Sequence, residues 1–146
     1  MTRATLTAEN FSLMMAVLVD GEVVGVQDLM AANFAAARTF KTGSWLTMSR
    51  QGQGIGKEMR AAILHFGFEG LGALRADTGA IEGNDRSVGV TRALGYHENG
   101  RTVKAREGER VICNEFCMER AEWEPRRRDD ITIEGLDACL PLLGLE

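Results

Sequence analysis

The segment SRQGQGIGKEMR, Ser49 to Arg60, carries Gly52, Gly54 and Gly56 at alternate positions and then continues with helical periodicity. Inside a helix, glycine is about 1 kcal/mol less favourable than alanine, so a glycine cluster at a helix start needs another explanation. Glycine lets a ligand approach the backbone and permits dihedral angles closed to other residues. A helix start of this kind exposes N–H groups at the positive end of the helix dipole, which suits a phosphate.

Two common phosphate-binding motifs do not fit the spacing of this segment. A Rossmann GxGxxG motif counted from Gly52 would have Lys57 in place of its last glycine. A Walker A loop ending at Gly56-Lys57 would need glycine at Gln51 and serine or threonine at Glu58. The segment therefore predicts an anion site of a different type.

The sequence around the loop predicts two hairpins and two further strands. Asp20-Gly21 suits a type I′ turn between the first two strands, and Glu107–Glu109 marks the turn of the second hairpin. With two helices, the order is β-β-β-α-β-α-β-β, which is typical of an α/β (α+β) fold with a mixed sheet. The predicted extended segments are Leu13–Val19, Glu22–Leu29, Arg38–Met48 and Ala73–Ile81, followed by the hairpin within Arg101–Arg120.

Both predicted helices follow the central part of the chain. The second has Asn84 as its N-cap and ends at Gly95. The first begins at Ile55, and its polar positions place charged side chains away from the core. Its apolar positions at helical spacing are Ile55, Met59, Ala62, Ile63, Phe66 and Gly70 or Leu71, with Lys57, Glu58, Arg60 and Glu69 on the other faces.

The composition indicates one globular domain. The chain has 146 residues, of which 45% are hydrophobic, and a net charge of −4. That charge argues against a nucleic-acid-binding surface over the whole domain. The longest apolar run near the start, FSLMMAVLV, is too short to span a bilayer and lacks a signal-peptide cleavage site, so we expect a cytoplasmic protein with no membrane partner.

The cysteines and histidines do not predict a metal site. Cys113, Cys117 and Cys139 form an odd set without a CxxC pair, so buried small hydrophobes are favoured over a zinc site or a disulfide. His65 and His97 are far apart in the sequence, and we expect each to be a packing or surface residue. No metal is therefore expected.

The sequence QGQGIG, Gln51–Gly56, matches a Q/R-x-x-G-x-G/A signature. It is followed by a helix, a strand, an N-x-x-S sequence that begins at Asn84, and an LGY sequence that ends at Tyr96. This combination resembles the Gcn5-related N-acetyltransferase (GNAT) superfamily, in particular its RimJ/RimL-like branch, over about Leu13–Trp123. The resemblance implies a GNAT-like mixed, mostly antiparallel sheet with two helices following the central strand.

The resemblance also implies a site for acetyl-CoA. The loop amides would hold the diphosphate, the main chain of Leu46–Met48 would pair with the pantetheine arm, and Asn84 would contact that arm. Arg50, Lys57 and Arg60 would add positive charge beside the phosphates, although a solvated helix face would look the same. The cofactor-binding residues implied in this way are Leu46, Thr47, Met48, Gln51, Gly52, Gln53, Gly54, Ile55, Gly56, Lys57, Asn84 and Ser87.

The implied reaction is direct acetyl transfer from the thioester to an amine, with coenzyme A leaving as a thiolate. Many members use a tyrosine as acid seven residues after the asparagine. That position is Thr91 here, and Tyr96 is expected in the core. Ser87 matches the serine of the RimL-like branch and would donate to the sulfur, although an N3 capping role explains it equally well. Asp77 is the expected base, with Glu82 as an alternative.

The departure from the family lies before the first hairpin. We expect one GNAT-like domain over 1–146, with 1–12 as a linker or helix remnant, 13–123 as the core and 124–146 as a C-terminal extension. An N-terminally truncated domain of this kind would have an incomplete acceptor side, which favours a homodimer. Three functions stay open: an N-acetyltransferase for a primary amine, a coenzyme A-binding protein with little or no transferase activity, and an interaction module that keeps only the fold.

Overall fold

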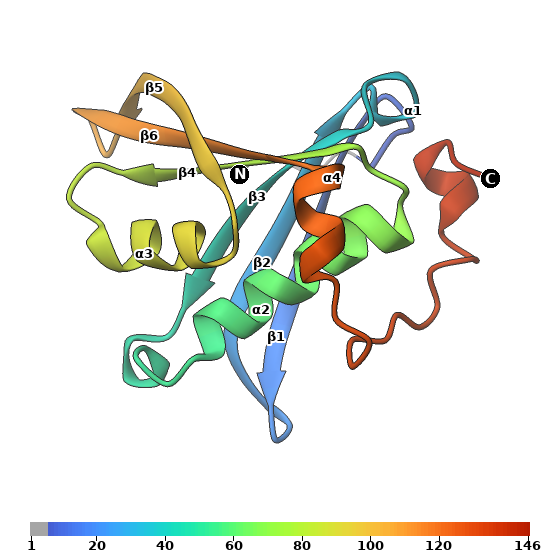
Figure 1. Ribbon diagram of the computed structural model, residues 1–146, viewed down its shortest axis with the longest axis horizontal. Coiled ribbons are helices and arrows are strands. Elements are labelled where there is room, and N and C mark those ends of the chain that lie inside the picture. The colour runs from blue at the N-terminus through green and yellow to red at the C-terminus, as the bar shows by residue number, and fades with distance from the viewer. Residues whose placement is uncertain (1–5) are drawn as a thin grey trace.

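A six-stranded sheet in the order β1-β2-β3-β4-β6-β5 forms the centre of the computed structural model, which describes residues 6–146 (Figure 1). Only β3 and β4 are parallel neighbours, and the other pairs are antiparallel. The predicted mixed, mostly antiparallel sheet is therefore confirmed. Part of the predicted linker or helix remnant, residues 1–5, lies outside the described residues. The strands are β1 Asn10–Val19, β2 Glu22–Ala32, β3 Thr39–Leu46, β4 Arg75–Ile81, β5 His97–Arg106 and β6 Glu109–Glu119.

The two predicted helices are present as α2 and α3, after β3 and β4. Shorter helical pieces were not predicted, because segments of three to five residues are too short to show a helical period. Within residues 6–146, no helix has both the length and the apolar character needed to cross a bilayer. The α-helices are α1 Phe34–Ala37, α2 Ile55–His65, α3 Asp85–Ala93 and α4 Arg120–Trp123; α2 continues into a π-helical turn at Phe66–Gly70, and 3₁₀ turns lie at Met48–Arg50, Glu124–Arg126 and Leu140–Leu143.

Local turn signals set the ends of the strands. Asp20 and Gly21 both have positive φ, 51° and 79°, as a type I′ turn requires. β1 begins at Asn10, three residues before the predicted start. β3 ends at Leu46 rather than at Met48, because the carbonyls of Thr47 and Met48 accept hydrogen bonds from Arg50 and Gln51 in a 3₁₀ turn.

The core lies between one face of the sheet and the helices. Phe68 is fully buried there, stacked on Trp123 at 5.0 Å between ring centroids and edge-on to Phe40 at 5.5 Å. Leu143 and Leu145 of the chain's end are buried in the same cluster. The C-terminal segment therefore packs onto the domain (Figure 1).

Candidate ligand-binding site

The parallel strands β3 and β4 diverge toward their C-terminal ends. Their register pairs Thr39–Thr42 with Arg75–Thr78 and extends no further among the described residues (Figure 1). Thr42 and Thr78 form the last pair, and both are buried, with their Oγ1 atoms 3.2 Å apart. A slot therefore opens between the two strands beyond this threonine pair.

Side-chain amides of two glutamines bind carbonyls of β3 near the slot. Gln27 is buried, and its Nε2 donates to the Gly43 carbonyl at 2.9 Å. Gln51 Nε2 donates to the Leu46 carbonyl at 3.2 Å. Because backbone carbonyls in a fold need partners, the bond from Gln51 stabilises the end of β3 where β4 no longer pairs with it.

The glycine loop leads into the N-terminus of α2, which lies beside the slot and, within residues 6–146, has no side-chain cap. Gly52 and Gly54 have φ of 76° and 81°, and an ideal Cβ on either would meet no atom within 4 Å. The left-handed backbone, and not crowding, therefore requires glycine at both positions. Gly54 is the N-cap of α2, and no side chain caps this helix among the described residues. The N–H groups of its first turn therefore remain available to an anion.

The helices α2 and α3 differ in how their N-termini are capped. The side chain of Asn84 accepts a hydrogen bond from the N–H of Ser87 at 3.3 Å, so α3 is capped as predicted. Gly56 lies within the first turn of α2, and a Cβ there would meet only Leu46 Cδ2, at 4.0 Å. The backbone of α2 is thus open on the side of the slot.

The slot, the loop and the start of α3 enclose a pocket of about 290 Å³. Three of the lining side chains are cationic, Lys57, Arg60 and Arg86, and none is a carboxylate. This charge favours an anionic ligand. The lining residues are Ser44, Leu46, Gln51, Gly52, Gly54, Gly56, Lys57, Met59, Arg60, Asn84, Arg86, Ser87 and Val90.

Most of the predicted binding residues lie at this pocket. Leu46, Gln51, Gly52, Gly54, Gly56, Lys57, Asn84 and Ser87 line it, whereas Thr47, Met48, Gln53 and Ile55 do not. The expected extended pairing at Thr47 and Met48 is wrong, because the Thr47 N–H is bonded to the Val24 carbonyl and Met48 is exposed in the 3₁₀ turn. Only the part of β3 up to Leu46 offers an extended edge.

Arg60 lies inside the protein, although the sequence placed it on a polar face. Its side chain is 7% exposed, and it donates to Thr91 Oγ1 at 2.6 Å and to the Ser87 carbonyl at 3.2 Å. Burial lowers the pKa of Arg60. The guanidinium therefore links α2 to the second turn of α3. Arg50, in contrast, pairs with Glu22 at 2.9 Å and does not line the pocket.

Arg86 was missed by the sequence analysis. Its Nη1 donates to Gln51 Oε1 at 2.9 Å and so joins the start of α3 to the loop. A cation in the first turn of a helix opposes the helix dipole, which normally favours acidic residues there. This unfavourable placement, two residues after the Asn84 cap, is the feature of the sequence that could have indicated a binding role for Arg86.

The predicted base is not brought to this pocket. Asp77 is half-buried on β4, shares its sheet face with Arg75, and pairs with Arg75 Nε at 2.8 Å. The alternate residues Ala76 and Thr78 are buried, so Asp77 faces away from the helices. Glu82 pairs with Arg101 at 3.7 Å. Of the two predicted catalytic residues, Ser87 lies in the pocket and Asp77 does not.

Tyr96 is a core residue, as expected. It is buried, and burial raises its pKa to about 12. The phenol therefore stays protonated at neutral pH.

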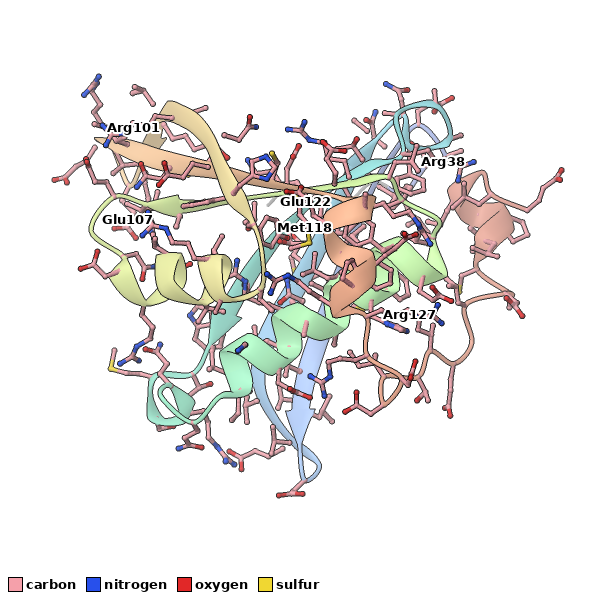
Figure 2. The ribbon with its side chains drawn as sticks, in the orientation of Figure 1. Arg38, Arg101, Glu107, Met118, Glu122 and Arg127 are labelled. Atoms are coloured by element: carbon pink, nitrogen blue, oxygen red, sulfur yellow. The ribbon has the colours of Figure 1, made fainter. Side chains whose placement is uncertain are left out.

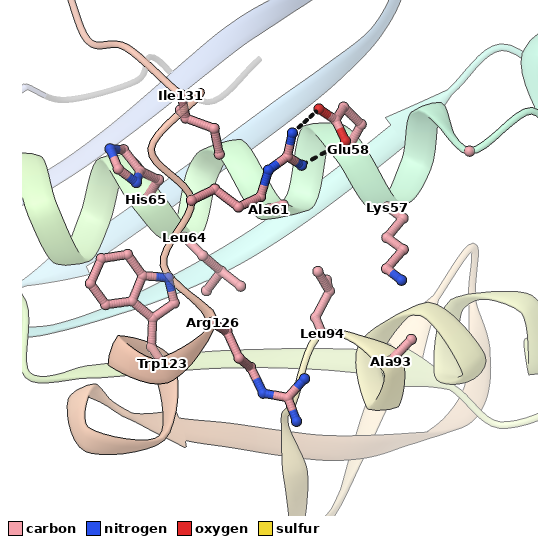
Figure 3. Close-up of a pocket in the computed structure, with 12 residues that line it drawn as sticks. Lys57, Glu58, Ala61, Leu64, His65, Ala93, Leu94, Trp123, Arg126 and Ile131 are labelled. Carbon is pink, nitrogen blue, oxygen red and sulfur yellow. Dashed lines mark hydrogen bonds and ion pairs between the residues drawn. The ribbon is translucent and has the colours of Figure 1, made fainter.

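A second hollow, of about 440 Å³, lies along the length of α2, from Gly54 to His65 (Figure 3). It shares Gly54 and Lys57 with the first pocket. Trp123 and Arg126 also line it (Figure 3). Glu58 contributes a carboxylate, which is bound by Arg128 at 2.8 Å through both oxygens. The presence of this carboxylate makes the hollow less suited than the slot to an anionic ligand.

Comparison with known proteins agrees with this geometry. The family described as "Acetyltransferase (GNAT) domain" matches residues 2–97. The chain therefore belongs to the GNAT acetyltransferase domain family, and the resemblance seen in the sequence is confirmed.

Solved structures share the fold at low identity. Mycobacterium smegmatis RimJ in complex with CoA-disulfide is 23% identical, with a TM-score of 0.73, over 77% of this chain and 55% of that chain. A variant of the spermidine N-acetyltransferase SpeG from Vibrio cholerae is 15% identical, with a TM-score of 0.69, over 81% of this chain and 70% of that chain. The chain spans 64% of the length of another similar structure, which is described as a probable acetyltransferase.

Proposed function

We propose that the chain is an acetyl-CoA-dependent N-acetyltransferase that acts on a primary amine, either of a small molecule or at a protein N-terminus. One observation carries this proposal: the uncapped glycine loop and three cations line one pocket beside separated parallel strands. Membership of the GNAT family supports acetyl transfer in general. The names of similar structures, a spermidine N-acetyltransferase and a RimJ complex with CoA-disulfide, support an amine acceptor and coenzyme A.

In this proposal, the diphosphate lies on the amides of the loop from Gln51 to Lys57. The pantetheine arm follows the edge of β3 up to Leu46 and enters the slot that begins at the Thr42–Thr78 pair. The core would comprise residues 13–123, with 124–146 as an extension, and the enzyme would work in the cytoplasm with acetyl-CoA and an amine as partners.

The chemistry needs an acid near the sulfur and a base near the amine. The backbone of Ser87 is fixed, because its N–H is bonded to Asn84 and its carbonyl accepts from Arg60 and Thr91. None of the hydrogen bonds among residues 6–146 uses its hydroxyl, which is therefore free to donate to the leaving thiolate. Asp77 is proposed as the base, acting through water from the other face of β4.

Replacing Ser87 with alanine should lower turnover by about 10–100-fold, because a positioned proton donor typically contributes that much or more. The Kd for coenzyme A should change by less than about twofold, since the diphosphate contacts remain. Steady-state kinetics and calorimetry measure the two quantities. Ser49→Ala, in the nearby 3₁₀ turn, is the control. Unchanged turnover in Ser87→Ala would leave Ser87 with the capping role alone.

Calorimetric titration with acetyl-CoA tests the proposed function itself. A folded chain with no measurable affinity would contradict it and favour an interaction module. A thiol-release assay with spermidine and with peptides that have free N-termini then separates transferase activity from binding alone. Binding without release would favour the alternative, a coenzyme A-binding protein with little or no transferase activity.

Arg86→Ala should weaken acetyl-CoA binding by about tenfold at low salt, because a charge-assisted contact to phosphate is lost. The difference from the unmodified protein should shrink as salt is raised, since salt screens exposed charges. Arg92→Ala is the matched control: Arg92 is on the same helix, pairs with Glu98 at 2.7 Å and does not line the pocket. Equal losses in the two variants would contradict a role for Arg86 in binding.

We also propose that the chain forms a homodimer through the open face of β1–β3. Met14 and Trp45 are 69% and 62% exposed there, and Ala16, Val26 and Trp45 are cross-strand neighbours on that face. An exposed apolar patch on a sheet face favours association. Met14→Glu should therefore shift the mass measured by light scattering toward that of a monomer. An unchanged mass, or a monomeric unmodified chain, would contradict the proposal.

A further inference from the structure

A chain of three hydrogen-bonded side chains lies apart from the ligand pocket. Cys117 Sγ on β6 is 3.1 Å from His97 Nε2 on β5. His97 Nδ1 is 2.9 Å from Glu122 Oε1, at the start of α4 where it meets the sheet (Figure 2). A nucleophile, a base and an orienting carboxylate in hydrogen-bond reach of one another form the arrangement that activates thiols and hydroxyls in proteins.

Backbone structure fixes each member of this chain. His97 and Cys117 are paired in the antiparallel register of β5 and β6, which brings them together from 20 residues apart. Glu122 belongs to the capping box of α4, where its Oε2 accepts from the Glu119 N–H at 2.8 Å. The expectation that His97 is only a packing or surface residue overlooked this cross-strand pair.

The Glu122 carboxylate determines which nitrogen of His97 carries the proton. The bond from the Glu119 N–H lowers the pKa of Glu122, which is therefore ionised at neutral pH. An ionised carboxylate can only accept, so His97 donates through Nδ1–H. Its Nε2 lone pair then faces the thiol and can take its proton.

The thiol itself is protected and protonated. Cys117 is 3% exposed, and burial raises its pKa. A protonated thiol is a poor nucleophile unless a base removes the proton as it reacts. Because so little of the side chain is accessible, only a very small electrophile can reach the sulfur.

We propose that Cys117 is a peroxide-reactive thiol, with His97 as its base and Glu122 as the residue that orients the imidazole. The thiol proton passes to His97 Nε2 as the sulfur attacks one oxygen of hydrogen peroxide and the O–O bond breaks. The second oxygen leaves as hydroxide and takes the proton from the imidazolium to form water. The sulfur is oxidised by two electrons to a sulfenic acid, and the peroxide is reduced.

The chain contains its own matched control. Cys113 lies on the same strand four residues earlier, is also 3% exposed, and burial also raises its pKa. Its Sγ donates to the Asn114 carbonyl at 3.8 Å, and its charged neighbours are Glu115, Lys104 and Lys41, with no imidazole among them. Burial is thus equal at the two thiols, while the base is present at only one.

The experiment exposes the folded chain to dilute hydrogen peroxide, traps sulfenic acid with dimedone after unfolding, and quantifies each cysteine peptide by mass spectrometry. Cys117 should be oxidised at least about tenfold faster than Cys113, which is below the roughly 10²–10⁴-fold that a positioned base typically provides. H97Q and E122Q should each slow the oxidation of Cys117 while that of Cys113 stays the same. E98Q, one residue from His97 on β5 and paired with Arg92, should leave both rates unchanged.

If His97 had only a structural role, its replacement would raise the oxidation rate of Cys117 instead of lowering it. Loosening of the β5–β6 hairpin would expose both cysteines and raise both rates. Equal rates for Cys113 and Cys117 in the unmodified chain, or a Cys117 rate that falls in neither H97Q nor E122Q, would overturn the proposal.

Discussion

Replacing Gly56 with leucine should weaken coenzyme A binding by about 100-fold or more and leave the fold at least as stable. Gly56 is helical and lines the pocket, and a Cβ there meets only Leu46 Cδ2, at 4.0 Å, so we expect a longer side chain to extend into the pocket. It would separate a diphosphate from the loop amides. Losing two charge-assisted hydrogen bonds of about 1.5–3 kcal/mol each corresponds to roughly 10²–10⁴-fold in affinity.

The same substitution removes a glycine from a helix, which should add up to about 1 kcal/mol to the free energy of unfolding. Gly89→Leu is the matched control, because Gly89 is a helical glycine of α3, meets no atom within 4 Å and does not line the pocket. Calorimetry gives the affinity and urea unfolding gives the stability. If Gly56→Leu binds coenzyme A as the unmodified chain does, the diphosphate does not lie on this loop.

Features with a local cause could be predicted from the sequence. Asp20-Gly21 specifies its turn through two positive φ angles, and Asn84 caps α3 through a hydrogen bond to Ser87, three residues away. The glycine loop and the helix after it are likewise specified by residues that are close to one another in the sequence. These signals fixed the order of the elements, and with it the position of the candidate pocket.

Contacts between distant segments could not be predicted in the same way. Arg86 meets Gln51 across 35 residues, and Cys117 meets His97 across 20, and neither pair has a pattern in the sequence. The sheet face on which Asp77 lies, in contrast, could have been predicted. The small apolar residues Ala76 and Ala80 lie on the opposite face of β4 and indicate that this opposite face is the buried one.

The buried face of the first helix was predicted only in part: Met59, Ile63 and Leu71 are buried as predicted, but two other positions are not. An unbroken period of 3.6 residues from Ile55 places Ala62 and Phe66 in the core. In the structure, Ala62 is exposed and Phe66 only half-buried. Arg60, Leu64 and Phe68 are buried at intervals of four residues, so the buried face of the helix is rotated relative to the predicted one. A π-helical turn then follows at Phe66–Gly70, where the Leu71 N–H bonds to the Phe66 carbonyl at 3.0 Å, five residues back.

Phe68→Ala should therefore be the most destabilising of the substitutions considered for this chain. The ring is fully buried between Phe40 and Trp123, and truncating a buried phenylalanine typically costs about 3–5 kcal/mol in the free energy of unfolding. Phe66→Ala, two residues earlier in the same π turn, provides the matched control. Because Phe66 is half-buried, we expect a loss of about 1–2 kcal/mol there.

Urea unfolding of both variants followed by tryptophan fluorescence compares the two losses directly, since Trp123 packs on Phe68. The ratio of the losses depends on the helix geometry and not on the size of the removed group, because both substitutions delete the same side chain. A helix that buried the predicted face through Ala62 and Phe66 would make Phe66 the more buried ring, and it would reverse the order. A larger loss for Phe66→Ala would therefore contradict the burial of Phe68 between Phe40 and Trp123.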